Sequence, residues 1–238
     1  MAKKSQSSND RRAKLEEMRE QQRSADRRRT ILVVTAALVV GGGLVAAAAV
    51  PLVRSTLNDP ANKDWSEFGV AAAEASCEPV EETPPSGEAD HRPDGEVVSY
   101  ESVPPASGPH YAVPAPFTRK FYTPADAPEV ERLVHNLEHG YAVVWYDPAV
   151  LDEQEQTLRD LAVKTADSDD TKEETAGKVV VAPWDPERGE FPEGKAYALT
   201  RWGAEQSYRQ YCGELSGEAV RDFVQAYPSS DAPEPFGA

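Results

Sequence analysis

Sulfur is scarce in this chain of 238 residues, which contains two cysteines and two methionines. Both methionines, Met1 and Met18, precede residue 30, so the rest of the chain has no thioether for a methionine-rich Cu(I) site. The sequence also lacks Cys-x-x-Cys, G-x-S-x-G, phosphate-loop and G-x-G-x-x-G motifs. These absences argue against thioredoxin-type redox chemistry, a nucleophile-elbow hydrolase and a nucleotide cofactor.

Basic residues are few outside the first 29 residues. That segment holds ten of the 25 Lys and Arg but five of the 41 Asp and Glu, so residues 30–238 carry a net charge of −21. A surface this acidic repels nucleic acid and anionic lipid headgroups. The sequence therefore predicts no nucleic-acid partner and a basic arm over residues 1–29.

One long apolar run follows that arm. Residues 30–53 contain no charged residue in 24 positions, and at a rise of about 1.5 Å per residue this length crosses a hydrocarbon core of about 30 Å. The run predicts a transmembrane helix, and the preceding Lys and Arg predict a cytoplasmic N-terminus. A cleaved signal peptide is the alternative, since residues 46–49 are small, but the long charged leader favours an uncleaved anchor. We therefore expect a single-pass protein of the cell membrane with an extracytoplasmic C-terminal domain.

The two cysteines both follow the predicted membrane helix. Cys77 and Cys212 would lie on the outer side, where thiols usually oxidise, so a disulfide between them is expected. A metal-binding or reactive cysteine is the alternative.

Composition divides the rest of the chain into a linker, a domain and a tail. Residues 54–95 are expected to form an extracytoplasmic stalk and an acidic, proline-rich linker, and residues 229–238 a disordered tail. Between them, residues 96–228 are expected to form a single α+β domain with a mixed sheet packed by helices, preceded by one transmembrane helix. YAVVWY is apolar on both faces and predicts a central, buried strand. The elements expected in the domain are strands at 96–101, 141–146, 178–183 and 195–202, and helices at 127–139, 149–165 and 216–227.

The helix expected at 127–139 carries a His/Glu face. At about 100° per residue, Leu133 and Leu137 belong to an apolar stripe, whereas His135, Glu138 and His139 lie apart from it. His135 and His139 are one turn apart, so their imidazoles can converge on one ion. The same residues match the H-x-x-E-H pattern of inverted zinc peptidases, in which Glu138 would be the general base for a zinc-bound water. That class also needs a downstream glutamate ligand, which the sequence does not single out.

His110 is the third candidate ligand. It follows Ser-Gly-Pro in a proline-rich loop, whose stiff backbone can present a side chain at a fixed place. His110, His135 and His139 could form a three-histidine site completed by Glu138 or water, and imidazole ligands suit Zn(II) or Cu(II). His91 lies in the acidic linker and is expected to be exposed and outside the site. The alternative is that these histidines only make hydrogen bonds within local structure.

Four segments, PPASGPHYAVPAP, LVHNLEHGYAVVWY, KVVVAPW and ALTRWG, resemble the family known as domain of unknown function 3105. The resemblance covers about residues 75–228 and implies an extracytoplasmic domain behind a single membrane span. It implies that Cys77 stands where members often carry a cysteine. The glycine usual after the PAP segment is missing from FTRKFY, so this loop departs from the family pattern. The resemblance brings no assigned reaction, but it implies that the family motif includes His110, His135, Glu138 and His139.

Three functions are therefore open from the sequence. The first is a metal-binding protein that stores, delivers or senses a transition metal. The second is a metal-dependent hydrolase with Glu138 as general base. The third is a metal-free module that binds a protein partner, in which the histidine motifs only stabilise the fold.

Overall fold

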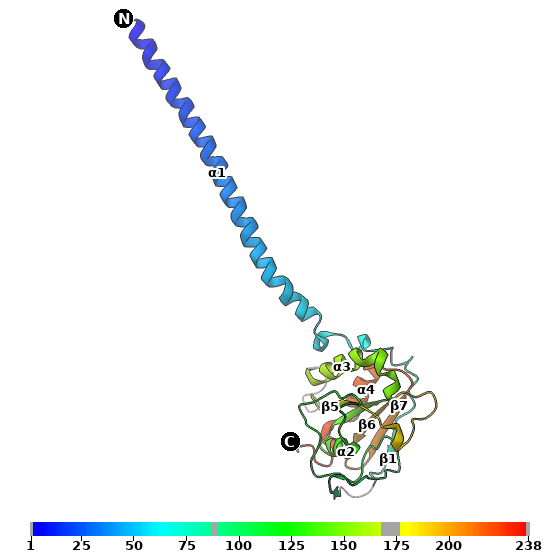
Figure 1. Cartoon of the computed structure of the whole chain (residues 1–238). Helices are drawn as coiled ribbons and strands as arrows, with labels where there is room; N and C mark the ends of the chain where they lie inside the picture. The colour runs from blue at the N-terminus through cyan, green and yellow to red at the C-terminus, as the bar shows by residue number, and fades with distance from the viewer. Residues whose placement is uncertain (1, 87–89, 168–176, 237–238) are drawn as a thin grey trace. The chain divides into compact units, whose positions relative to one another are not determined.

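The computed structural model describes residues 2–86, 90–167 and 177–236. It divides into two units, residues 1–57 and residues 58–238. The first unit is a single helix, α1 (Ala2–Leu57), which precedes the α+β unit in the chain (Figure 1). Within the described residues, none of the helices is both long and apolar enough to span a bilayer. The side chains of α1 are described from residue 14 on, except those of residues 44, 46, 48, 51, 52, 54, 55 and 57.

The second unit is built on a five-stranded mixed sheet, as the sequence predicts. The strand order is β1-β7-β6-β4-β5, with β4 parallel to β5 and the other neighbours antiparallel. β4 lies between β6 and β5 with every side chain buried, which confirms the interior strand predicted from YAVVWY. The strands are β1 (Glu81–Thr83), β4 (Ala142–Tyr146), β5 (Val179–Pro183), β6 (Tyr197–Trp202) and β7 (Ser207–Cys212).

Helices cover both faces of this sheet, with α3 and α4 on one side and α2 on the other (Figure 1). Leu158 of α3 and Phe223 of α4 share a core cluster with Val144. Leu137 of α2 belongs to the cluster on the opposite face, with Val143. Successive residues of β4 thus face different layers, because side chains alternate along a strand. The helices are α2 (Val130–Glu138), α3 (Leu151–Asp167) and α4 (Gly217–Ala226), and the 3-10 helices are η1 (Pro60–Asn62), η2 (Trp65–Glu67), η3 (Pro148–Val150), η4 (Pro186–Arg188) and η5 (Ser229–Asp231).

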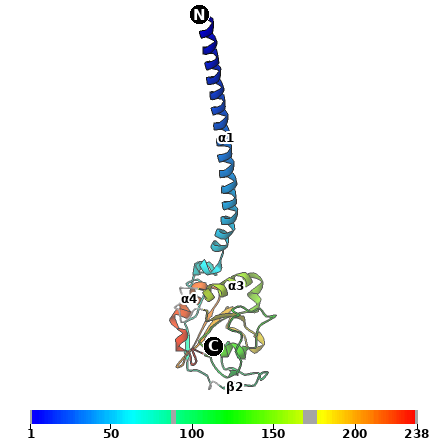
Figure 2. The same ribbon diagram turned by 90° about the vertical axis from the view of Figure 1, so that its left-hand side faces the viewer.

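A separate pair of short strands lies at the end of this unit opposite α3 and α4 (Figure 2). β2 (His91–Arg92) runs parallel to β3 (His110–Tyr111), with His91 beside His110. The backbone N–H of His110 donates to the carbonyl of Asp90 at 3.1 Å. This pairing holds the end of the predicted linker, at His91 and Arg92, against the loop that carries His110.

The described ranges of the structure contain four strands that were not predicted, β1, β2, β3 and β7, and lack one that was. Residues 96–101 do not form the predicted strand, and Val97 in this segment is 74% exposed. β7, by contrast, was not predicted, because SYRQYC mixes polar and aromatic residues. It forms because it pairs with β6 along its whole length. Pairing partners, which local sequence does not reveal, decide both cases.

The start of the predicted stalk packs into the core of the second unit. Trp65 is 5% exposed and Phe68 is 1% exposed, and both belong to the core cluster of α3 and α4. The carbonyl of Phe68 accepts a hydrogen bond from the backbone N–H of Gly217 at 2.8 Å. Two large aromatic side chains this close together in sequence favour burial over an extended stalk.

A disulfide joins Cys77 to Cys212, which confirms the predicted pairing between residues 135 positions apart. Cys212 ends β7 and is buried, while Cys77 precedes β1 and packs against the same core cluster. The bond therefore fastens the segment that leads into β1 to the sheet. It leaves neither cysteine free for the alternative of metal binding or thiol chemistry.

Residues 228–236, here called the C-terminal strap, lie against the end of α2. A disordered tail was expected from residue 229, but Ser229 is 2% and Ala232 is 5% exposed. Gly140, just after α2, has φ of +79°, and a Cβ there would lie 2.5 Å from the carbonyl oxygen of Ser229. Glycine therefore serves both the turn and the close approach of the strap. The last two residues of the predicted tail, 237–238, lie outside the described residues.

Candidate metal centre

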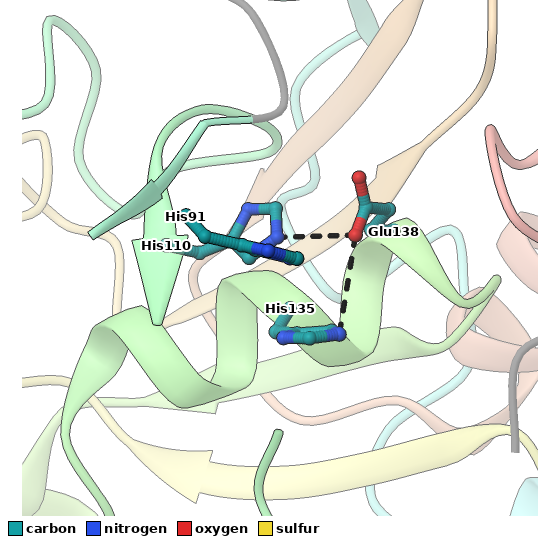
Figure 3. A group of neighbouring side chains, drawn as sticks. All are labelled: His91, His110, His135 and Glu138. Carbon is teal, nitrogen blue, oxygen red and sulfur yellow. Dashed lines mark ion pairs between the residues drawn. The ribbon is translucent and has the colours of Figure 1, made fainter. Parts of the chain in front are cut away.

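A His/Glu cluster gathers where α2 meets β2 and β3 (Figure 3). His91 and His110 stand side by side in the parallel strand pair. His135 and Glu138 project from α2 and are three residues apart, which places them on one side of the helix. Three segments distant in sequence thus supply one constellation.

The ligand atoms of the four residues lie close enough to share an ion. One atom from each of His91, His110, His135 and Glu138 lies within 4.8 Å of the others. Glu138 Oε2 is 3.0 Å from His110 Nε2 and 4.0 Å from His135 Nε2. Two ligands of a tetrahedral zinc lie about 3.3 Å apart when the metal–ligand bonds are about 2.0–2.1 Å. The cluster could therefore hold a metal through three imidazoles and one carboxylate.

Backbone carbonyl groups orient two of the imidazoles. His110 Nδ1 lies 2.9 Å from the carbonyl oxygen of Gly108, and His135 Nδ1 lies 2.6 Å from that of Tyr111. A carbonyl oxygen can only accept, so each Nδ1 must carry the hydrogen. In the neutral ring, Nε2 then presents a lone pair toward the cluster. This is the arrangement in which metal-binding histidines are usually held.

Burial keeps these lone pairs available. His110, His135 and Glu138 are 0%, 5% and 3% exposed, whereas His91 is exposed. Burial lowers the pKa of His135 to about 4, so this ring is neutral near pH 7. Burial by itself would raise the pKa of Glu138, but contact with His110 and the positive charge that the nearby imidazoles carry when protonated hold it below its usual value. The carboxylate is therefore ionised beside a neutral imidazole.

His110 Nε2 is a buried polar atom without a hydrogen bond. The distance to Glu138 suits an ion pair, but the approach does not make a hydrogen bond, and no other partner lies among the described residues. Buried polar atoms are rarely left in this state, because the lost hydration costs free energy. An ion bound at Nε2 would supply the missing partner.

His139 stands at the edge of this group. Its Nε2 lies 2.8 Å from His135 Nε2, and its Nδ1 lies 3.1 Å from the carbonyl oxygen of Glu234. His139 shares a second set of possible ligands with Glu138 and Glu234, again within 4.8 Å. The carboxylate of Glu138 is common to both sets.

A family model described as "Protein of unknown function (DUF3105)" matches residues 91–238. The chain belongs to this family. The matched segment begins at His91 and runs past Glu234, so it contains the whole cluster. No curated protein and no solved structure matches the chain. DUF3105 membership assigns no reaction to the chain.

The sequence pointed to part of this DUF3105 site and missed the rest. The structure brings His110, His135 and Glu138 together, as expected, and places His139 in the neighbouring set instead of beside His110. His91 is exposed, as expected, but it joins the cluster. The sequence around His91 and around Glu234 does not indicate a metal site, because each residue reaches the site only through contacts with a distant segment. Only the fold shows that β2 places His91 beside His110 of the SGPH motif.

Proposed function

We propose that the DUF3105 domain binds a transition metal, Zn(II) or Cu(II), through His110, His135 and Glu138, with His91 as fourth ligand. The observation that carries this proposal is the convergence of Nε2 lone pairs from buried imidazoles whose Nδ1 atoms face carbonyl oxygens. His139, which the sequence grouped with these ligands, would adjoin the ion from the side of His135.

The donor set supports these two ions. Imidazole suits both Zn(II) and Cu(II), and a mixed imidazole and carboxylate site is common for zinc. A bound cation would give His110 Nε2 a partner and balance the charge of Glu138. Four protein ligands fill a tetrahedral zinc, which is typical of sites that hold an ion and do no chemistry with it. The proposed role is therefore to store, deliver or sense metal.

A metal-dependent hydrolase with Glu138 as general base is less well supported. Glu138 Oε2 lies among the imidazole nitrogens, in the place of a ligand. A cavity of about 550 Å³ in this domain is lined by residues that include Trp145, Trp184 and Arg188 but by none of the four cluster residues. A substrate there would not reach the ion. In a metal-free interaction module, His110 Nε2 would face Glu138 at 3.0 Å but would have no hydrogen bond.

We propose that metal binding takes place outside the cell membrane, with residues 30–53 as a single anchor and residues 1–29 as a cytoplasmic arm. The support comes from the 24 uncharged positions and the basic residues before them. The Cys77–Cys212 bond fits an oxidising compartment. We expect the chain to remain in the membrane fraction of expressing cells after alkaline carbonate washing, and its release into the supernatant would refute the anchor.

The metal proposal predicts that the purified protein contains about one equivalent of zinc or copper at the cluster. The full chain, in mild detergent and without a histidine tag or reductant, would be analysed by inductively coupled plasma mass spectrometry. His110→Gln/His135→Gln should lose this equivalent, because glutamine keeps most of the side-chain volume but removes two imidazole ligands. Glu193→Gln, on an exposed residue outside the cluster, is the control.

Two outcomes would contradict this prediction. One is wild-type protein that stays metal-free after dialysis against Zn(II) and against Cu(II). The other is a double variant that keeps the wild-type metal content. Circular dichroism of both proteins would establish that the double variant is folded.

A further inference from the structure

Glu138 is shared by two sets of possible ligands, and the second set is independent of His91 and His110. It consists of Glu138, His139 and Glu234, each with a ligand atom within 4.8 Å of the others. Because His139 Nδ1 faces the carbonyl oxygen of Glu234, its Nε2 is the ring nitrogen left to bind an ion. That nitrogen lies 2.8 Å from His135 Nε2. The two sets are therefore immediate neighbours.

The backbone of Glu234 is fixed, although its side chain is exposed. Its N–H donates to the carbonyl of Glu138 at 3.0 Å, and its own carbonyl faces His139. Next to it, the carbonyl of Pro235 accepts a hydrogen bond from Lys178 Nζ at 2.5 Å. These contacts, together with buried Ser229, hold the C-terminal strap against α2. The backbone that carries the Glu234 carboxylate is therefore held in place beside His139.

The charges around this second set favour a cation. Two carboxylates lie beside one imidazole. Glu234 Oε2 is 3.8 Å from His139 Nδ1, so the exposed Glu234 side chain would turn to meet an ion at Nε2. Lys178 contacts the strap, and its ammonium group donates to the carbonyls of His139 and Pro235. Among the described residues it forms no ion pair with either carboxylate. The side chain of Glu234 is 62% exposed, so an ion can enter from solvent.

We propose that His139, Glu234 and Glu138 form a second cation position, so that the centre binds two divalent transition ions with Glu138 between them. This inference rests on the proposed function, because Glu138 is also a ligand of the first ion. In known two-metal sites the ions lie about 3.5–4 Å apart, which allows a carboxylate to be shared. Three protein donors leave coordination positions open to water or a small anion. The second ion is therefore the one that exchanges with ions in solution and binds ligands from outside the protein.

Zinc stoichiometry tests this proposal. Metal-stripped full chain would be dialysed to equilibrium against Zn(II) without reductant, and bound zinc measured by inductively coupled plasma mass spectrometry. Wild-type protein should hold two equivalents, Glu234→Gln and His139→Gln one each, and the control Glu193→Gln two. Glu234→Gln keeps the backbone contacts of the strap, so the variant should fold.

The possible outcomes separate the two proposals. One equivalent in wild type that Glu234→Gln leaves unchanged would overturn the second position and support the first. Two equivalents that persist in both Glu234→Gln and His139→Gln would place the second ion elsewhere and also overturn this proposal. No bound zinc in wild type would overturn the second position, and the first as well if Cu(II) also fails to bind.

Discussion

Removal of the Cys77–Cys212 bond with the Cys77→Ala/Cys212→Ala variant is expected to lower the free energy of unfolding by about 4 to 5 kcal/mol. The bond links residues 135 positions apart, so its main effect is to restrict the unfolded chain. Alanine at the buried Cys212 adds no polar group to the core. Urea unfolding, followed by the fluorescence of the four buried tryptophans, measures the loss.

Wild-type protein reduced before unfolding is the control for this variant. It should lose nearly the same free energy, because reduction removes the same covalent constraint. Equal unfolding midpoints for the variant and the oxidised wild-type protein would contradict the prediction. Since a loss of this size approaches the whole stability of a typical domain, the variant should also yield less folded protein.

Arg188→Met is expected to lower the free energy of unfolding by about 3 to 5 kcal/mol. Arg188 donates to both carboxylate oxygens of Glu131, at 2.8 and 3.1 Å, and the Glu131 side chain is fully buried. Without the guanidinium, Glu131 keeps only the backbone N–H of Val98, at 2.9 Å, among its described contacts. A buried carboxylate would then lack its counter-charge, which is more costly than losing an exposed ion pair.

The control for Arg188 is Arg221→Met, which removes an ion pair with exposed Asp222 and should cost less than about 1 kcal/mol. The double variant Glu131→Leu/Arg188→Met should lose less than the sum of the single variants, because it leaves no buried charge. Additive losses, or an Arg188→Met loss as small as that of Arg221→Met, would argue against the role of the pair. Glu131 lies on α2, so the same measurement tests what anchors the helix that carries His135 and Glu138.

Local pattern predicted the elements with continuous apolar character. The stripe that includes Leu133 and Leu137 predicted α2, and YAVVWY predicted β4, since both segments bury the side that their sequence marks as apolar. Residues 96–101 also contain β-branched and aromatic residues, but they pair with no strand in the part of the chain that the structure describes. β7 has a neighbour and forms despite its polar residues. Sheet membership depends on partners, and partners are not visible in a single segment.

The site was predictable to the extent that it lies on one helix and one stiff loop. His135 and Glu138 are a helix turn apart, and His110 follows a motif that limits its backbone, so all three were candidates from sequence. His91 and Glu234 lie in segments whose composition indicates exposure. Both residues are indeed exposed, and only the contacts of their backbones bring them to α2. Amino-acid composition thus predicted that both side chains are exposed, but it could not show that they lie beside α2.

The pairing of β2 with β3 has a further consequence for how this centre tolerates change in the chain. Each strand has two residues, and His91 meets His110 in one alignment. A slip of a single residue would put Arg92 beside His110 and bring a guanidinium to the place of an imidazole. The intervening loop, residues 93–109, is exposed from Gly95 to Val97 and buried from Pro104 to Ser107. Insertions at the exposed turn should be tolerated better than one extra residue inside β2, which would remove a ligand.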